Sequence, residues 1–502
     1  MASRSAARPA SEEEEDAEGT APRTRGLLRA LGLTLASTLV WGVAHLRVGR
    51  RWAGALLLAL FLALASAGTV AGLFFRSDLL QLAVRPDWLT GLAAGILTLG
   101  LLWITVVIRS YQIVRPETMS LGARSAGVAG VILLCFAVAL PTAWAGYSTY
   151  LYRDALTSIF RTGDSHGRPI NIKDPWNGQR RVNVLLLGGD AAANREGVRT
   201  DSMTVASIDT KTGDTVLLSL PRNLERVPMP QGPARDRFPY GFTGDGPATP
   251  GLLNEVYQYA EDHPDVVPGA RKNERGPELL KATISGILGI PVDYYVLVDM
   301  FGFADIIDAI GGVKIKITQP ISYGLEGGVL QPGDRTLSGK EALWYGRSRT
   351  NSDDYTRMGR QKCLLRAIAR QADPRTVLTS FDRLAAATKR AIATDIPQEL
   401  LPAFITLSNR FNDGGQVTSL QFVPPLIYTG NPDFALIRRL AAQAVATSPE
   451  SASPSASPSA SASPSASASR STSPQAGRTP GATSSKQPTR QTKPVSLDAT
   501  CP

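Results

Sequence analysis

Three long uncharged stretches dominate the first 150 residues of the chain. Residues 52–75, 88–108 and 125–152 hold 24, 21 and 28 uncharged residues in a row. Each stretch reaches the roughly 20 residues that an apolar helix needs to cross the hydrocarbon core of a bilayer. The pattern therefore predicts membrane-spanning helices. The expected spans are residues 54–75, 88–108 and 126–148.

A shorter apolar stretch, residues 30–46, precedes these spans. It holds only 17 uncharged residues, among them two threonines, a serine and a histidine. We expect it to be interfacial or re-entrant, with a further span as the alternative, so that the membrane region covers residues 27–150. Residues 1–26 contain the acidic run Glu12–Asp16, which argues against a cleavable signal peptide. We expect them to form a disordered cytoplasmic N-terminus.

The arginines around the spans predict the orientation of the chain. Three arginines between residues 47 and 51 precede the first span, three lie between the second and third, and two lie between the first and second. Since arginine-rich loops stay in the cytoplasm, the chain after about residue 150 is expected outside it. A fourth span would move one end of the chain across the membrane. The expected protein is a multi-pass protein of the cell membrane with an extracytoplasmic folded domain.

The middle of the chain has the alternating strands and helices of an α/β fold. Residues 182–187 (VNVLLL) form a near-continuous apolar run, which is typical of a strand buried on both faces. Residues 202–208 and 215–220 predict two further strands, joined by a hairpin. These strands bring Asp190, Asp201 and Arg222 to strand ends, where α/β sheets commonly bind ligands. Ordinary turn chemistry is the alternative for each residue taken alone.

Helices and strands continue to about residue 372. Helices are predicted over residues 276–288 and 301–310, and strands over residues 291–300 and 313–318. Ser338 and Glu341 fit a capping box at the start of a further helix over residues 341–345. This helix leads to Arg347 and Arg349, which we expect to share one face of an extended segment.

A helix that begins at Asp354 places polar residues on one face. Asp354, Arg357 and Gln361 are spaced i, i+3 and i+7, with Arg360 at the edge of that face. A capped, solvated helix end is the ordinary explanation. The nearby pair of Arg347 and Arg349 favours an anion site, because the planar guanidinium matches phosphate oxygens.

The amino-acid composition limits the partners and the catalytic groups that the protein can use. The chain has 53 basic and 43 acidic residues, and a net charge of +10 suggests nucleic acid or anionic membrane partners. The spans favour the lipid bilayer, and no helix-turn-helix pattern supports nucleic acid. With 3 His and 3 widely separated Cys, we exclude a disulfide framework and argue against a zinc site. Any catalysis must therefore depend on acids, arginines, lysines or hydroxyls.

The C-terminal part of the chain has a different composition. Residues 449–502 begin with Ser-Ala-Pro repeats and have almost no large apolar side chains. Such a segment buries too little apolar surface to offset the entropy lost on ordering. We expect residues 447–502 to form a disordered tail without a site.

Five segments together resemble the LytR-CpsA-Psr (LCP) family of cell-wall ligases. They run in order over about residues 181–372. The segments are VNVLLLGGDAAANREGVRTDSMTVASID, VLLSLPRN, LLNEVYQYA, GIPVDYYVLVDMFGFADIIDAIGG and SGKEALWYGRSRTNSDDYTRMGRQ. The resemblance implies an LCP-type central β-sheet flanked by helices, over residues 181–446, joined to the membrane region by a linker over residues 151–180.

The resemblance also implies an activity and its partners. Family members transfer a glycan phosphate from a polyprenyl-pyrophosphate-linked glycan to a peptidoglycan hydroxyl, with Mg²⁺. By the matching motifs, Asp190 and Asp201 would handle Mg²⁺ and pyrophosphate, and Arg222, Arg347 and Arg349 would be catalytic with them. The residues expected to bind substrate are Arg199, Asp354, Arg357, Arg360 and Gln361.

The chain departs from the family pattern at two positions. Asn223 replaces an acid after the Pro-Arg pair, and Leu252 stands where many members have a lysine. Arg195 or Arg199 is a candidate to supply the missing cation.

An apolar pocket is also needed for the polyprenyl chain. Its lining and core packing are alternatives for each of the residues Ile284, Ile287, Leu288, Phe301 and Phe303. Two other functions are open: a pyrophosphatase that acts on the same lipid, and a membrane-bound transcriptional attenuator. The latter needs the folded domain inside the cell with a basic surface for DNA.

Overall fold

The computed structural model describes residues 12–116, 119–160, 163, 170–171, 173–190, 198–246, 251–324, 327–350, 352–371, 392–446 and 492–501. The chain divides into two compact units, the first built mainly on Met1–Ile170 and the second mainly on the residues after it. The first 11 residues, residues 161–162, 164–169 and 172 of the expected linker, and most of the Ser/Ala/Pro-rich segment lie outside the described residues.

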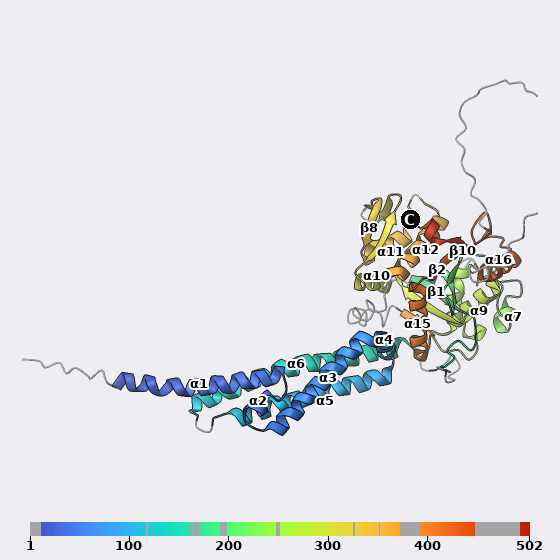
Figure 1. The fold of residues 1–502 in the computed structure, drawn as a ribbon. Coiled ribbons are helices and arrows are strands. Elements are labelled where there is room, and N and C mark those ends of the chain that lie inside the picture. Colours follow the sequence, from blue (N-terminus) through green and yellow to red (C-terminus); the bar gives the residue numbers. More distant parts are fainter. Residues whose placement is uncertain are drawn as a thin grey trace, which may run out of the picture. The chain divides into compact units, whose positions relative to one another are not determined.

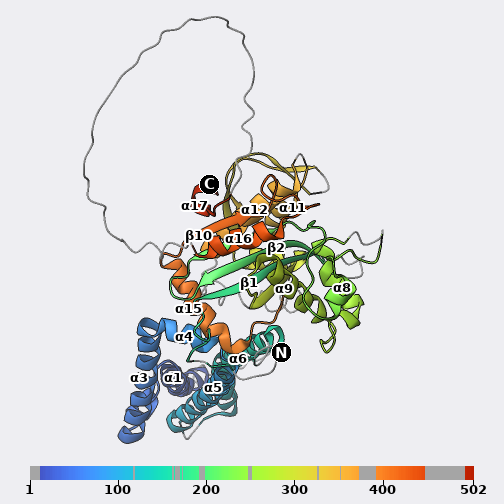
Figure 2. The ribbon, with the colours of Figure 1, turned by 90° about the vertical axis from the view of Figure 1, so that its right-hand side faces the viewer.

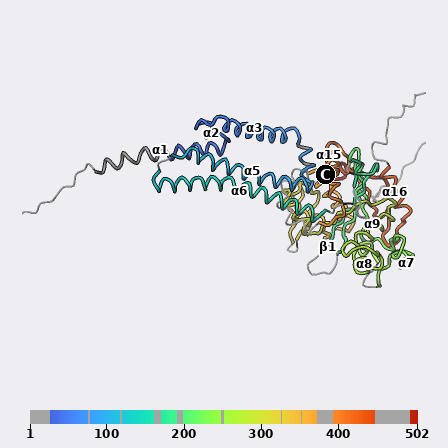
Figure 3. Tube along the Cα trace, turned by 90° about the horizontal axis from the view of Figure 1, so that it is seen from below, coloured from blue at the N-terminus to red at the C-terminus, as the bar shows by residue number. Residues whose placement is uncertain are grey.

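The first unit consists of helices. Its elements are α1 (Glu12–Leu39), α2 (Val43–Arg47), α3 (Arg51–Phe74), α4 (Arg76–Ala83), α5 (Pro86–Val114) and α6 (Leu121–Ile159). By length and composition, α3, α5 and α6 are able to cross a membrane, and 0%, 17% and 11% of their most apolar windows are buried. Apolar helices that stay so exposed fit a lipid environment. The three predicted spans are confirmed as helices, and Figure 3 shows α5 and α6 side by side.

The earlier apolar stretch, residues 30–46, is not one helix. The chain turns after α1, and Gly42 takes the left-handed conformation with φ 92° before α2 begins. A Cβ at Gly42 would lie 2.3 Å from the carbonyl oxygen of Gly54, so the turn requires glycine. Helix α1 starts at Glu12, and the disorder expected for residues 1–26 is therefore wrong from that residue on.

A seven-stranded sheet forms the centre of the second unit. Its order is β11-β10-β3-β2-β1-β4-β9. The strands are β1 (Arg181–Asp190), β2 (Arg199–Asp209), β3 (Thr215–Leu220), β4 (Tyr294–Asp299), β9 (Ile392–Thr394), β10 (Val417–Gln421) and β11 (Val495–Ser496). β1 runs parallel to β4 and β3 parallel to β10, while the other neighbours are antiparallel. The carboxyl ends of β1, β3 and β4 therefore meet the start of β2 at one end of the sheet.

Both faces of this sheet are covered. Leu185 and Leu187 belong to one buried cluster with residues of α8, α9 and α16, and Leu186 packs with a second cluster on β2 and β3. Burial on both faces explains why β1 is almost continuously apolar. Figure 1 shows α10, α11 and α12 on one side of β1, β2 and β10, with α9 and α16 on the other.

The helices of this unit are α7 (Pro233–Arg237), α8 (Val256–Asp262), α9 (Arg275–Leu288), α10 (Met300–Ala309), α11 (Gly339–Arg347), α12 (Asp354–Gln371), α16 (Phe434–Ala446) and α17 (Leu497–Thr500). Helix α15 (Leu401–Asn412) begins in the first unit and ends in this one. Single 3-10 turns of this unit are η1 (Leu253–Glu255) and η2 (Pro264–Val266), whereas η3 (Gln398–Leu400) belongs to the first unit. The predicted capping box is confirmed: the Ser338 hydroxyl accepts from the Glu341 amide, and the Glu341 carboxylate accepts from Ser338.

Two small sheets lie outside the central one. β5 (Val313–Ile317) pairs antiparallel with β8 (Gly333–Leu337), and β6 (Ile321–Tyr323) with β7 (Gly328–Leu330). The core side of β5 packs with α11 and α12 in a separate hydrophobic cluster. Its Lys314 and Lys316 are exposed on the other side, as the alternation of the strand predicts.

The end of the chain returns to the fold. β11 pairs with β10, α17 lies beside it (Figure 2), and the side chains of Leu497 and Cys501 are 0% and 4% exposed. Cys501 forms a disulfide with Cys363 of α12, across 138 residues. Two expectations are therefore wrong: the tail is not disordered at residues 492–501, and the cysteines do support a disulfide. Their distance in sequence concealed a contact that only the fold creates.

Candidate active site

A cavity of about 510 Å³ opens at the end of the sheet where β1, β3 and β4 finish and β2 begins. Helices α10, α11 and α12 supply its remaining wall. Of the residues predicted from sequence, Arg199, Asp201, Arg222, Arg347, Arg349, Arg357 and Gln361 line it. The strand ends thus bring together side chains that are far apart in the sequence.

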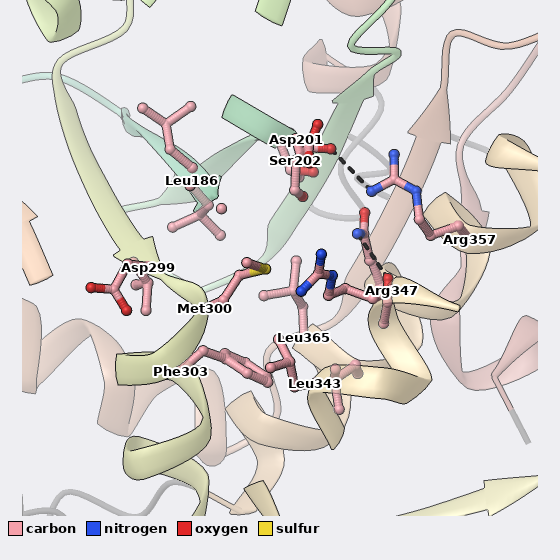
Figure 4. Close-up of a pocket in the computed structure, with 18 of the residues that line it drawn as sticks. Leu186, Asp201, Ser202, Asp299, Met300, Phe303, Leu343, Arg347, Arg357 and Leu365 are labelled. Carbon is pink, nitrogen blue, oxygen red and sulfur yellow. Dashed lines mark hydrogen bonds between the residues drawn. The ribbon is translucent and has the colours of Figure 1, made fainter. Parts of the chain in front are cut away.

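The cavity has a polar end and an apolar end. Figure 4 shows Asp201, Ser202 and Arg357 at one end, Met300, Phe303, Leu343 and Leu365 at the other, and Arg347 between the two groups. The lining residues include five arginines and two aspartates, so the cavity is electropositive. Such a shape suits a ligand with an anionic group joined to a hydrocarbon chain.

Four charged residues form a closed network at the polar end. Arg357 donates from Nε and Nη2 to the two carboxylate oxygens of Asp354, both at 3.1 Å, and from Nη1 to the backbone oxygen of Asp201 at 3.1 Å. Arg222 is paired with the Asp201 carboxylate and lies 3.8 Å from the Asp354 carboxylate. The network joins the start of β2, the segment after β3 and the first turn of α12.

Arg347 and Arg349 approach from the end of α11. Arg347 occupies the last helical turn, and Ser348 is the C-cap residue. The two arginines therefore do not lie on one extended segment, and that expectation is wrong. Both nevertheless line the cavity with exposed side chains, and the Arg347 guanidinium lies 5.9 Å from the centre of the Trp344 ring.

Arg360 and Gln361 hold the segment that carries these arginines. Arg360 donates to the Ser348 carbonyl and, at 3.1 Å, to the Ser352 hydroxyl, while Gln361 donates to the Gly346 carbonyl at 3.1 Å. Burial lowers the pKa of the Arg360 guanidinium, and the nearby charge of Arg357 acts in the same direction. Arg360 is not among the lining residues, so its described contacts indicate a positioning role.

The end of β1 is closely packed. The β1–β2 register shifts between Gly188 and Gly189, and Asp190 lies opposite Arg199. A Cβ at Gly189 would approach Leu297 and Val198 to 3.1 and 3.2 Å, which explains the need for a small residue. The side chain of Asp190 and all of Arg195 lie outside the described residues.

The apolar lining differs from the expected one. Ile284, Ile287 and Leu288 are fully buried in the core on the opposite face of the sheet, and Phe301 is 62% exposed. Of the five candidates, only Phe303 lines the cavity. The apolar wall is instead supplied mainly by residues that sequence reasoning missed: Val296, Val298, Met300, Leu343, Leu364, Leu365 and Ile368.

Four polar residues of the cavity were also missed: Ser202, Thr204, Asn254 and Asp299. Both departures from the family pattern lie outside the cavity lining. Asn254 lines the cavity with its buried Oδ1 atom unpaired among the described residues, and Asp299 caps α10 by accepting from the Gly302 amide at 2.6 Å. Asn223 donates to Thr429 at 3.3 Å and does not line the cavity. Leu252, the second position that departs from the family pattern, is likewise not a lining residue.

The polar end offers oxygen ligands of the kind that Mg²⁺ prefers. The Asp201 carboxylate lines the cavity and its side chain is 33% exposed. In the described part of the chain no group of three or more His, Cys, Asp or Glu residues forms a metal cluster. This donor set fits a hard cation that takes one or two carboxylates and completes its shell with phosphate oxygens and water.

Comparisons with known proteins agree with this architecture. Residues 151–431 match the LytR_cpsA_psr family. The chain is 25% identical over 261 residues to the polyisoprenyl-teichoic acid–peptidoglycan teichoic acid transferase TagU of Bacillus subtilis, covering 50% of this chain and 72% of that protein. It is 24% identical over 264 residues to the protein of the same name from Bacillus mycoides, covering 51% and 75%.

Two of the solved structures that match the chain are those of proteins named TagV and TagT. B. subtilis TagV matches with 22% identity and a TM-score of 0.39, over 53% of this chain and 96% of that chain. A structure described as TagT bound to LIIa-WTA matches with 22% identity and a TM-score of 0.40, over 56% and 97%.

Proposed function

Because the chain belongs to the LytR-CpsA-Psr family, we propose that it transfers a glycopolymer from a polyprenyl-pyrophosphate carrier to peptidoglycan. One observation carries the proposal: the same cavity is lined by arginines at one end and by apolar residues at the other. The apolar residues are Met300, Phe303, Leu343 and Leu365. A pyrophosphate with a polyprenyl tail has the same division into an anionic head and an apolar chain.

The charge of the cavity matches the proposed donor. A pyrophosphate diester carries two negative charges, and the transferring phosphoryl group spreads charge over its equatorial oxygens. Arg222 follows β3, Arg347 and Arg349 come from the end of α11, and all three line one cavity. Arginines fixed before the reaction stabilise developing charge without reorganising. Arg357 and Arg360 are held by internal partners, and we assign them to positioning.

The proposed step replaces one phosphate ester by another. The oxygen of an acceptor hydroxyl attacks the phosphorus that bears the glycan, and the bond from that phosphorus to the bridging oxygen breaks. Polyprenyl phosphate leaves with the bridging oxygen and the electron pair. The proton of the hydroxyl passes to a base, and Asp201 and Asp299 are the carboxylates among the described lining residues.

We include Mg²⁺ in the proposal. Asp201, with Asp190 as the second expected ligand, would hold the ion beside the phosphate oxygens. The bound ion supplies positive charge that offsets the repulsion between two carboxylates, which is about 4 kcal/mol at about 4 Å and an effective dielectric near 20. Arg222 already neutralises part of the Asp201 charge by its ion pair.

We also propose that α3, α5 and α6 cross the cell membrane and that the folded domain lies outside the cytoplasm. The arginine distribution supports this orientation. Tyr240 is 93% exposed and serves as a labelling position. A Tyr240→Cys variant in intact cells should react with a membrane-impermeant thiol reagent. If labelling requires cell lysis, the folded domain lies inside the cell. A membrane-bound transcriptional attenuator would then again be a candidate function.

Transfer itself needs a direct assay. The full chain in detergent is incubated with a polyprenyl-pyrophosphate glycan and peptidoglycan, with and without Mg²⁺, and the products are separated by mass. We expect a phosphodiester-linked glycan on peptidoglycan together with polyprenyl phosphate. Release of free glycan phosphate at the same rate without peptidoglycan would identify a pyrophosphatase instead. An Arg347→Ala, Arg349→Ala variant serves as the inactive control.

A further inference from the structure

A second cavity, of about 800 Å³, lies beside α12. We name it the basic cavity. It is lined by residues of β5, β8, α11, α12 and the C-terminal segment: Lys314, Ile315, Lys316, Asp334, Arg335, Thr336, Tyr345, Cys363, Arg366, Ala367, Arg370, Gln371, Asp498 and Cys501. None of these residues lines the candidate active site.

The lining of the basic cavity carries five cations and two carboxylates. Lys314, Lys316 and Arg335 are exposed, and none of the three forms an ion pair within the described part of the chain. The simplest explanation of these exposed cations is an ordinary solvated surface. It does not account for cations from two strands and a helix around one hollow, where five cations outnumber two carboxylates and like charges repel.

The structure contains an example of the anion that this cavity accepts. The Asp498 carboxylate is paired with Arg366, whose Nε lies 3.0 Å from it, and lies 3.8 Å from Arg370. Asp498 belongs to a segment that returns from a distant part of the chain and is fixed by the disulfide of Cys501. The helix arginines thus bind an oxyanion, while Lys314 and Lys316 remain for further anionic groups.

Helix α12 connects the basic cavity to the candidate active site. Its Arg357, Gln361 and Leu365 line the active site, whereas Arg366 and Arg370 line the basic cavity. At the end of α11, Tyr345 lines the basic cavity and the next residue, Gly346, lines the active site. A long substrate held at the active site therefore has a second cationic surface within the same unit.

We propose that the basic cavity binds the polymer part of the donor, as a glycopolymer chain that carries repeated anionic groups. This inference rests on the proposed function and deepens it, because it selects anionic over neutral polymers. Several spaced cations bind a chain of spaced phosphates or carboxylates through many weak contacts. The lysines tolerate varied spacing because each is a flexible point charge.

The test removes charge from the basic cavity without touching the active site. A Lys314→Ala, Lys316→Ala, Arg335→Ala variant of the full chain is compared with a Lys211→Ala, Arg271→Ala, Lys272→Ala variant. All six side chains are exposed and both variants lose the same charge. Binding of inorganic polyphosphate, polygalacturonate and neutral dextran is measured over a range of salt concentrations, together with binding of a short-chain polyprenyl pyrophosphate.

We expect wild-type chain and the control variant to bind polyphosphate or polygalacturonate but not dextran. The basic-cavity variant should bind the same polyanion at least tenfold more weakly, with a shallower dependence on salt. Polyphosphate and polygalacturonate separate phosphate from carboxylate polymers. Equal polyanion binding by both triple variants would overturn the proposal. Binding to phosphatidylglycerol vesicles and to peptidoglycan fragments is measured in parallel. Loss of binding to these two probes alone would also overturn the proposal, because it would assign the cavity to the membrane or to the acceptor.

The lipid probe separates this inference from the proposed function. Short-chain polyprenyl pyrophosphate has no polymer, so both triple variants should bind it like the wild-type chain. If the wild-type chain fails to bind this lipid but still binds polyanions through the basic cavity, the proposed donor is wrong and the polyanion site stands.

Discussion

Arg357 offers a stringent test of the charged network, because its side chain is only 6% exposed and all its described contacts lie inside the protein. The guanidinium makes two hydrogen bonds to Asp354 and one to the backbone oxygen of Asp201, each at 3.1 Å. In an Arg357→Lys variant a single ammonium group replaces a planar fork. It keeps the charge but reaches only one of the two partners well.

The cost follows from these contacts. Two hydrogen bonds to charged groups are lost, each worth about 1.5–3 kcal/mol. Hydrogen bonds from water to the Asp354 carboxylate offset part of this free energy, since the Asp354 side chain is 21% exposed. We therefore expect about 2–3 kcal/mol of destabilisation, which at about 2–4 °C per kcal/mol lowers the Tm by roughly 5–10 °C.

Thermal unfolding of the full chain in detergent, followed by intrinsic fluorescence, measures this loss. Arg439→Lys is the matched control, because Arg439 is exposed on α16 and forms no ion pair among the described residues. The control should leave the Tm unchanged. If the Arg357→Lys variant is as stable as the control, the charged network does not stabilise the fold.

Three further predictions concern the site and the fold. Arg347→Lys and Arg349→Lys should each weaken binding of a short-chain polyprenyl pyrophosphate at least tenfold, about 1.4 kcal/mol. The Tm should stay unchanged because both side chains are exposed. Wild-type affinity, measured by calorimetry, would mean that these arginines do not bind the pyrophosphate. Asp201→Asn should abolish transfer and its Mg²⁺ dependence, and full turnover at limiting Mg²⁺ would exclude the metal role. Cys501→Ser removes a disulfide that spans 138 residues and should lower the free energy of unfolding by about 2–5 kcal/mol. Cys135→Ser, at a free cysteine, is the control. Equal Tm values for the two variants would contradict a stabilising disulfide.

Strands and helices with strong local patterns were predictable from sequence. The runs at residues 182–187 and 215–220 specify buried strands through their apolar side chains alone, and Ser338 and Glu341 mark a helix start through their own hydrogen bonds. Small sheets were less visible: the residues of β6 and β7 form strands only because they pair with each other.

The polar residues of the site were predictable because chemistry restricts them to few types. Arginines and aspartates at strand ends are conspicuous in sequence, and most of those predicted line the cavity. Apolar lining was not predictable in this way. Leu365 and Ile284 have the same character, yet one faces the cavity and the other the core, a difference set by packing between distant segments. The Cys363–Cys501 contact has the same origin.

The ion pair between Arg222 and Asp201 bears on product release. In the described structure Arg222 already has a carboxylate partner, so a pyrophosphate must compete with Asp201 for its guanidinium. This competition weakens ground-state binding, which favours turnover as long as the transition state gains more. After transfer the remaining polyprenyl phosphate has one phosphate fewer, and Asp201 can recapture Arg222. The Asp201 carboxylate would then compete with the bound polyprenyl phosphate for Arg222 and help this product leave. An Asp201→Asn variant should therefore bind added polyprenyl phosphate more tightly than the wild-type chain.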